Sequence, residues 1–351
     1  MTNILLTIYV IALFLAFFAE NSKPKEKYAI LAVFCFILAL FAGLRDFTWP
    51  DTLAYYVAYQ RSPDLFHVTL ESRANLYSEK GFFYIGVIVK TLLDNYQIYF
   101  FTVAALSFIF LYKGLKQFTL FPLIGICAYI ARFYFGRNLM QIRSGLSYAI
   151  LLLGIKYIKE KKFWHYLLIV FIAYQFHRSA IVGIPVYFIC NWVHLRKIHI
   201  VICVVISFII GIFFQDVVHI FIEDNASDLS IGAAYTEAGG MRSYYEGLGM
   251  LNPMIYFQTF FLLAYTFLEN KLSQKHKYYY IIRDCYLYST MILICFCSYR
   301  VLSARTSTIF ATLEYAIIPS VIFIFNKKSE RWLAYAGITI VLSFFFYSHI
   351  N

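Results

Sequence analysis

The chain has 351 residues, of which 61% are hydrophobic and 14% are charged, whereas about 25% of the residues of a soluble domain are charged. This composition excludes an ordinary soluble domain and predicts an all-α, polytopic integral membrane protein. The formal charge of +11 comes from basic residues dispersed in short hinges, so it does not indicate a nucleic-acid-binding protein.

Apolar runs long enough to cross a bilayer recur from end to end. The first run lacks a basic segment before it, so we expect a retained helix and not a cleaved signal peptide. We predict about twelve transmembrane helices, near residues 3–19, 28–44, 97–112, 119–135, 143–158, 163–176, 179–193, 200–218, 251–268, 278–298, 306–325 and 332–348.

The apolar segment 82–93 does not fit this series, because it is short and is interrupted by Lys90. Counting it as a crossing would move the basic hinge at Lys113 to the other side of the membrane. We therefore predict a short re-entrant or interfacial helix on the outer side.

Orientation follows from the lysines, because basic hinges stay in the cytoplasm. With twelve spans, 15 of the 17 lysines lie in hinges on the cytoplasmic side of the membrane. This arrangement places both termini outside. The long outer stretches 45–96 and 219–250 are rich in Tyr, Gly and carboxylates. We expect them to carry the substrate-facing elements of a single membrane domain, residues 1–351.

The arginines are distributed differently from the lysines. Ten of 13 lie in predicted outer loops or outer helix ends, where positive charge opposes the topology rule. Guanidinium groups bind phosphate through two hydrogen bonds at once, which an ammonium group cannot do. The distribution favours a site for a lipid-linked phosphate or pyrophosphate, although individual arginines could instead pair with nearby acids or extend to the membrane surface.

Polar motifs stand at the outer ends of several predicted spans. Arg137, Gln141 and Ser144 would share one face if their segment is helical. Two arginines fall in one predicted outer turn after Tyr299. The full set of motifs is Gly43-Leu44-Arg45-Asp46 followed by Asp51 and Tyr55, Arg137 to Gly145, His177-Arg178-Ser179-Ala180, and Tyr299-Arg300 to Arg305.

In this order the motifs resemble the EpsG family of Wzy-like polysaccharide polymerases. The resemblance covers nearly the whole chain, whereas loop 219–250 matches nothing in the family pattern. It rests on Gly43-x-Arg45, Asp51-x-x-x-Tyr55, Glu79 before the short helix, Gln141-Ile142-Arg143-Ser144, the turn 177–180, and Arg300 and Arg305 before a span containing Pro319.

The resemblance implies a glycosyltransferase of GT-C-like architecture in the bacterial inner membrane, with its active site on the periplasmic or extracellular side. It would transfer a growing glycan from polyprenyl (undecaprenyl) pyrophosphate to the non-reducing end of a new lipid-linked repeat. O antigen, capsule and exopolysaccharide are all possible products. The family also implies membrane lipid as a partner and a separate chain-length regulator protein.

The leaving pyrophosphate gains charge as the glycosidic bond breaks, so preorganised arginines would stabilise the transition state. We assign this role to Arg143, Arg300 and Arg305. The residues we expect to bind substrate are Arg45, Arg137, Gln141, Arg178, Tyr55, Tyr299 and Arg242.

The acceptor hydroxyl needs a base. His177 is our candidate, because its arginine neighbours favour the neutral imidazole. Asp51 and Glu79 are alternatives, and His177 could instead cap a helix or bind the phosphate. We expect inversion without a cofactor or metal, since Glu223-Asp224 is the one adjacent outer carboxylate pair.

Three other functions remain open from the sequence: a transporter or flippase of lipid-linked oligosaccharide, a membrane O-acyltransferase, and a non-catalytic scaffold. A transporter would place charges at the membrane midplane and show internal repeats. Here the charges crowd both faces and no repeat is visible. Glu314 and Asp284 are the two carboxylates that keep the transporter in consideration.

Overall fold

The computed structural model describes residues 2–69, 79–193, 195–215, 217, 247–327 and 329–350. Within these ranges every regular element is a helix, so the all-α prediction is confirmed. The chain divides into two compact units. Unit 1 comprises residues 1–187 and 314–351, and unit 2 comprises residues 188–313.

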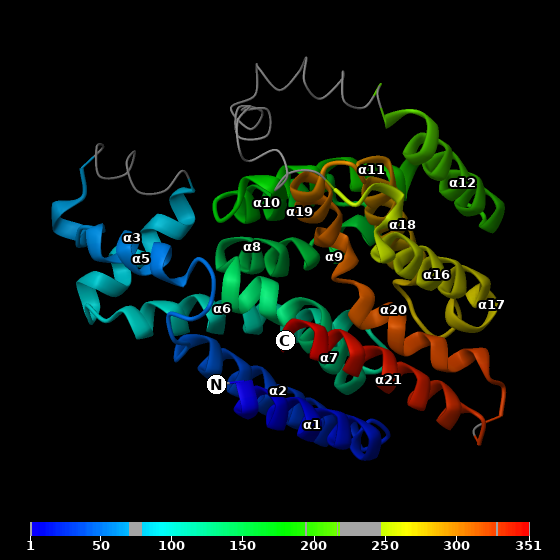
Figure 1. The fold of residues 1–351 in the computed structure, drawn as a ribbon, viewed down its shortest axis with the longest axis horizontal. Coiled ribbons are helices and arrows are strands. Elements are labelled where there is room, and N and C mark those ends of the chain that lie inside the picture. Colours follow the sequence, from blue (N-terminus) through cyan, green and yellow to red (C-terminus); the bar gives the residue numbers. More distant parts are fainter. Residues whose placement is uncertain are drawn as a thin grey trace. The chain divides into compact units, whose positions relative to one another are not determined.

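Unit 1 contains the N-terminal helices and the C-terminal segment that begins at Glu314. Figure 1 shows α1 and α2 side by side in blue. Its elements are α1 (Thr2–Ala19), α2 (Pro24–Gly43), α3 (Thr52–Arg61), η1 (Leu65–His67), α5 (Lys80–Leu92), α6 (Tyr96–Phe118), α7 (Pro122–Tyr129), the π-helix η2 (Ile130–Met140), α8 (Ile142–Leu152), α9 (Ile155–Lys159), α10 (Phe163–Tyr174), η3 (Arg178–Gly183), α20 (Glu314–Ser320), η5 (Val321–Ile324) and α21 (Arg331–Ile350).

Three helices of the described chain, α2, α6 and α21, are each long and apolar enough to cross a membrane. A fourth is added if Leu302–Ala311 and Glu314–Ile324 form one broken span. Helices α1, α10 and α12 are apolar but shorter. These helices indicate a membrane protein, while the count of twelve spans and the GT-C-like architecture stay predictions. Segment 82–93 is helical, as expected, within α5.

Several predicted spans are interrupted. The run 143–158 breaks between α8 and α9 at Gly154, where an added Cβ would lie 2.8 Å from the Tyr166 ring. The run 119–135 becomes α7 followed by η2, which continues to Met140. Hydropathy cannot show such breaks, because packing between helices causes them.

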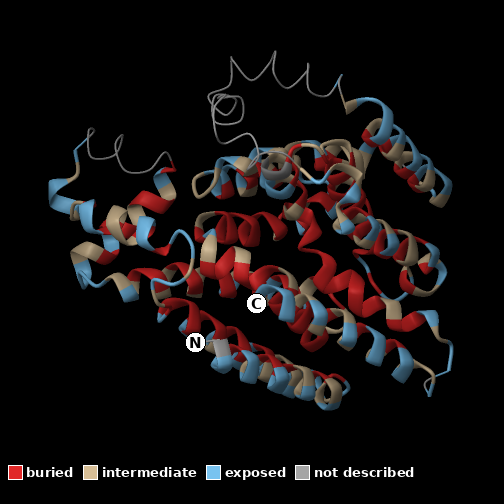
Figure 2. Cartoon of the chain, in the orientation of Figure 1, coloured by how far each residue is buried: buried red, intermediate tan, exposed pale blue. Residues whose placement is uncertain are grey.

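The core of unit 1 is formed by α7, α8 and α20. All eight residues of α7 and all seven of α20 are buried, and these helices lie in the red regions of Figure 2. An added Cβ at Gly125 would lie 2.7 Å from the Tyr315 carbonyl oxygen, so glycine permits this close approach. The buried Glu20 carboxylate accepts hydrogen bonds from the backbone N–H groups of Leu123 and Ile124 at the start of α7, where the helix dipole favours a negative charge.

A buried ion pair joins the π-helix to α20. Arg132 Nε lies 2.8 Å from Glu314 Oε2, and its Nη2 lies 3.5 Å from Oε1. Glu314 is fully buried. Glu314, one of the two carboxylates that keep a transporter in consideration, is therefore paired with an arginine.

The described part of unit 2 contains four longer helices and two shorter ones: α12 (Lys197–Phe213), η4 (Gly249–Leu251), α16 (Pro253–Phe267), α17 (Glu269–Leu272), α18 (Tyr279–Cys295) and α19 (Arg300–Ala311). Helix α11 (Ile184–Trp192) contains the boundary between the units. Helix α18 contacts α12, α16 and α19. Its buried Arg283 donates to Asp284 and to the Leu195 carbonyl oxygen at 2.9 and 2.7 Å.

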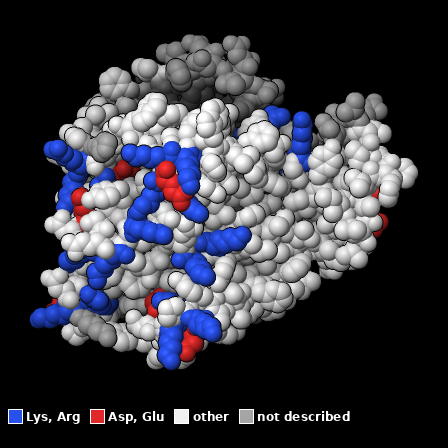
Figure 3. Space-filling view, turned by 180° about the vertical axis from the view of Figure 1, so that it is seen from behind, with Lys and Arg blue, Asp and Glu red and all other residues white. Residues whose placement is uncertain are grey.

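Charged side chains occupy little of the surface. On the face drawn in Figure 3, Lys and Arg stand in groups with a few acids among them, and most of the remaining described surface is uncharged. A wide uncharged surface is what a lipid environment requires. The prediction of a single membrane domain stays a prediction.

Candidate active site

The predicted outer segment after α2 folds into a turn and the short helix α3. Asp51 begins it with a φ of 61°, in the left-handed region, and its carbonyl oxygen accepts from Tyr55 N–H at 3.0 Å. The Asp51 side chain is exposed, whereas Tyr55 is buried. This turn directs Tyr55 into unit 1.

Arg45 follows α2 and is 3% exposed. Its Nη1 donates to the Asn138 carbonyl oxygen at 3.0 Å, and its guanidinium carbon lies 3.9 Å from the centre of the Phe100 ring. In the described part of the chain, Nε and Nη2 are buried without a hydrogen-bond partner. Burial lowers the pKa of Arg45 to about 10, so the group remains charged at neutral pH with two N–H positions available.

Arg143 lies in the first turn of α8 and forms an ion pair with Glu79, the residue before α5. The distance from Nη1 to Glu79 Oε2 is 2.8 Å. Glu79 is 6% exposed, whereas the Arg143 side chain is 32% exposed. The acid therefore orients a guanidinium that still reaches the surface.

Tyr55 links these two arginines. The Arg143 guanidinium carbon lies 5.8 Å from the centre of the Tyr55 ring. Burial raises the pKa of the Tyr55 phenol, Arg143 and Arg45 act to lower it, and Asp51 acts to raise it. Three other predicted site residues, Arg45, Asp51 and Arg143, therefore lie within electrostatic range of the Tyr55 phenol.

Arg137 and His177 meet the same aromatic ring. The Arg137 guanidinium carbon lies 4.3 Å from the centre of the Tyr148 ring, and the His177 ring packs edge-on against it at 5.9 Å. The Tyr148 hydroxyl lies 2.6 Å from Ser179 Oγ, which lies 2.6 Å from His177 Nδ1. A continuous hydrogen-bonded chain thus runs from Tyr148 to the imidazole.

His177 also caps the 3₁₀-helix η3, because its Nδ1 accepts from Ser179 N–H at 3.3 Å. This is the capping alternative that the sequence left open. While Nδ1 accepts this hydrogen bond, a neutral imidazole carries its proton on Nε2; Nε2 can accept a proton only in the tautomer whose Nδ1–H donates to Ser179 Oγ.

The loop before His177 is joined to the start of α5 through a backbone hydrogen bond. Gly81 N–H donates to the Gln175 carbonyl oxygen at 2.8 Å, and an added Cβ at Gly81 would lie 2.9 Å from that oxygen. The start of α5 therefore packs on the turn that carries His177. Arg45, Asp51, Tyr55, Glu79, Arg137, Arg143 and His177 all belong to unit 1.

A family model for the EpsG family matches residues 28–351. The chain belongs to the EpsG family. The resemblance drawn from the motifs is thus confirmed, and it identifies a membrane protein of a family of Wzy-like, glycosyltransferase-like polysaccharide polymerases. No curated protein and no solved structure matches the chain.

The EpsG match spans every predicted site residue, and these residues are divided between the two units. Tyr299 and Arg305 lie in unit 2, as does the backbone of Arg300. Arg300 to Arg305 form the start of α19 and not a short turn, so these two positions are roughly 140° apart around the helix. Arg242 lies outside the described residues.

The expected common face of Arg137, Gln141 and Ser144 is wrong. Gln141 has a φ of −90° and a ψ of 62°, which interrupts the helix between η2 and α8. Gln141 is exposed, and its carbonyl oxygen accepts from Ser144 Oγ at 2.9 Å. Arg178 is also exposed, at the start of η3.

Sequence reasoning missed the residues that hold the arginines in place. Asn138 lies inside a recognised motif and Ser179, which contacts His177, inside another, whereas Phe100 and Tyr148 lie outside the motifs; nothing in their spacing indicates these contacts. Among the described residues, no three His, Cys, Asp or Glu side chains gather as a metal site. The pair Glu223-Asp224 lies outside the described ranges.

Proposed function

We propose that this EpsG-family chain transfers a growing glycan from polyprenyl pyrophosphate to the non-reducing end of a new lipid-linked repeat. One observation carries the proposal: three guanidinium groups, those of Arg45, Arg137 and Arg143, are held in one part of unit 1 around Tyr55 and Tyr148. Positive charge of this density suits a multiply charged anion, and pyrophosphate matches the paired N–H groups of guanidinium.

The reaction needs stabilisation of its leaving group. The bond between the anomeric carbon and the pyrophosphate oxygen breaks, and the acceptor oxygen forms the new bond to that carbon. Negative charge collects on the departing pyrophosphate. Fixed guanidinium groups stabilise that charge more in the transition state than in the ground state. Arg143, held by Glu79, is the principal candidate, and Arg300 and Arg305 would contribute if unit 2 faces the same substrate.

The acceptor hydroxyl must also lose a proton. His177 would take it at Nε2 in the tautomer whose Nδ1–H donates to Ser179 Oγ, and that hydroxyl is also hydrogen-bonded to Tyr148. Asp51 is the alternative base, because its carboxylate is exposed close to Tyr55. Glu79 is less suited to the role, since its carboxylate is bound to Arg143. A single displacement of this kind inverts the anomeric centre, and we propose that it proceeds without a metal.

We further propose that the site faces outward from the bacterial cytoplasmic membrane. The basic hinges support this orientation. Donor and acceptor would both be undecaprenyl-pyrophosphate-linked oligosaccharides, and a separate chain-length regulator protein would act with the chain. The loops 46–78 and 219–250 would select the sugars.

The decisive experiment supplies purified full-length protein with fluorescent polyprenyl-pyrophosphate-linked repeat units, without nucleotide sugar or acyl donor. A ladder of lengthening glycans is expected, and it should persist in a chelator of divalent cations. The Arg143→Ala variant serves as the inactive control, and Lys161→Ala as the active one. Movement of the substrate across vesicles without chain growth would instead identify a flippase, and dependence on an acyl donor would identify an acyltransferase.

A further inference from the structure

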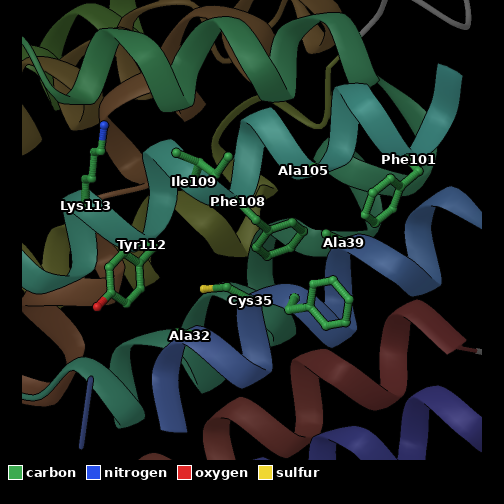
Figure 4. A pocket seen from close by; sticks show the side chains of 10 residues that line it. Ala32, Cys35, Ala39, Phe101, Ala105, Phe108, Ile109, Tyr112 and Lys113 are labelled. Carbon is green, nitrogen blue, oxygen red and sulfur yellow. The ribbon is translucent and has the colours of Figure 1, made fainter. Parts of the chain in front are cut away.

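A groove runs between α2 and α6 in unit 1. It has a volume of about 320 Å³, and its lining is apolar except at one end. Figure 4 shows Phe101 at one end and Lys113 with Tyr112 at the other. The small side chains of Ala32, Ala39 and Ala105 leave the space between them.

The two helices are in direct contact at the Phe101 end. An added Cβ at Gly43 would lie 2.6 Å from Phe101 Cβ, so glycine is needed for the backbones to approach there. From Phe101 to Lys113 the groove follows twelve residues of α6, which is about 18 Å of helix. One leaflet of a bilayer has roughly 15 Å of hydrocarbon. The groove is therefore about as long as one leaflet is deep.

The charged end of the groove is cationic. Lys113 is exposed, and its Nζ lies 5.7 Å from the centre of the Phe110 ring. Lys116, one turn further along α6, is also exposed and has its Nζ 4.9 Å from the centre of the Tyr28 ring. Lys113 lines the end of the groove and Lys116 stands one turn beyond it, so an anionic headgroup could bind at this end with its acyl chain in the groove.

A second groove in the same unit provides a contrast. It lies between α1 and α2, has a volume of about 410 Å³, and is lined by aliphatic and aromatic side chains with no charged residue. It could accept any hydrocarbon chain without regard to the headgroup. Of these two grooves, charge selectivity is therefore expected only at the one between α2 and α6.

We propose that the α2–α6 groove holds an acyl chain of an anionic phospholipid, with Lys113 bound to its phosphate. The lipid-linked donor is not the occupant. Arg45, which follows α2 and contacts Phe100 at the start of α6, lies at the opposite end of this helix pair from Lys113. The phospholipid belongs to the leaflet on the Lys113 side.

Photolabelling can test this site directly. Full-length protein is reconstituted in phosphatidylcholine vesicles that contain a small amount of one probe lipid with a diazirine on its acyl chain. The probe is phosphatidylglycerol in one preparation and phosphatidylcholine in the other. After illumination, labelled peptides are mapped by mass spectrometry. The phosphatidylglycerol probe should label residues 32–39 and 101–113 several-fold more than the phosphatidylcholine probe. The two probes should label the α1–α2 groove equally.

Matched variants separate the headgroup from the chain. Lys113→Gln should reduce labelling by the phosphatidylglycerol probe about fivefold, because one basic residue contributes about this much to binding at an anionic membrane surface. The exposed hinge variant Lys161→Gln should not reduce it. Ala32→Phe should block labelling in the α2–α6 groove. Ala29→Phe places the same ring on α2 in the other groove and should leave labelling of the α2–α6 groove intact.

Three results would overturn the proposal. One is equal labelling of the α2–α6 groove by both lipids, and another is full labelling in the Lys113→Gln protein. The third is stronger labelling by a diazirine polyprenyl phosphate than by phosphatidylglycerol, which would assign the groove to the donor. Chain growth is not the readout, so failure here leaves the polymerase proposal standing.

Discussion

Arg45 and Arg143 are held by different means, and this affects what each can do. Arg143 is oriented by the carboxylate of Glu79 and remains one-third exposed. Arg45 is oriented by a carbonyl oxygen and an aromatic ring, and it is almost fully buried. A buried guanidinium with unused N–H groups costs free energy unless a ligand satisfies it. We therefore expect Arg45 to bind the substrate and Arg143 to stabilise the charge that develops on the leaving pyrophosphate.

The first prediction concerns the geometry of Arg143. Arg143→Lys keeps the charge but loses the forked pair of N–H groups. Loss of a contact that strengthens in the transition state should cost ~2–4 kcal/mol, or roughly 30- to 1000-fold in the rate of chain growth. The rate is measured with purified protein at saturating substrate, with the hinge variant Lys161→Ala as the control. Normal polymer from a well-folded Arg143→Ala protein would show that the Glu79 pair is only structural.

The second prediction separates the two roles of His177. His177→Gln should retain donor binding and lose about 10²- to 10⁴-fold in rate, because an amide cannot act as a base. His177→Arg should be inactive as well if a base is required. Donor binding and single-turnover rates are measured together. An active His177→Arg protein would assign the residue to phosphate binding and make Asp51 the candidate base.

At the scale of elements, the junction between η2 and α8 depends on a glycine. An added Cβ at Gly145 would lie 2.2 Å from the Arg137 carbonyl oxygen, whereas nothing lies within 4 Å of one at Gly136. The position of Arg137 over Tyr148 thus depends on the absence of a side chain at residue 145. The exposed Gln141 between the two helices marks the same junction.

We therefore predict opposite effects for two Gly→Ala variants only nine residues apart. Gly145→Ala should lower stability by about 1–3 kcal/mol through overpacking and should reduce chain growth, since Arg137 moves. Gly136→Ala should be neutral or slightly stabilising, because alanine favours a helical backbone. Thermal unfolding in detergent and the chain-growth assay give both readouts. Equal behaviour of the two variants would contradict this account of the junction.

The sequence predicted most of the helices but not their interruptions. Runs of apolar residues located α1, α2, α6, α10, α12, α16, α18 and α21, because hydropathy is a local property of the chain. The π-helix η2, the break at Gly154 and the helix α3 depend on contacts with distant residues. The same difference between local properties and distant contacts applies to the site. Its arginines were recognised from their position in the sequence, whereas the pairing of Arg143 with Glu79 joins residues 64 positions apart and has no local signal.

At the scale of the whole molecule, the orientation in the membrane is the assumption on which the site depends. We predict that Lys25, Lys161 and Lys275 face the cytoplasm, and that Ser72, Ser227 and Asn351 face outward. Single cysteines at these positions, in a cysteine-free protein, are labelled with a membrane-impermeant maleimide in intact cells. Labelling of position 72 only after permeabilisation would reverse the orientation and move the proposed site to the cytoplasm.

The ion pair between Arg132 and Glu314 has a consequence for how the protein is made. Its partners are 182 residues apart, and unit 1 is closed only by the segment that begins at Glu314. At a synthesis rate of ~5–20 residues per second, roughly 10–40 s separate the two residues on the ribosome. During that interval Arg132 lacks the Glu314 carboxylate, and an arginine without its acidic partner is costly within a membrane. We therefore expect the segment of the π-helix to stay near the membrane surface or beside water until the last helices complete unit 1. A chain stopped before Glu314 would lack this ion pair, and we expect it to be less stable than the full-length protein.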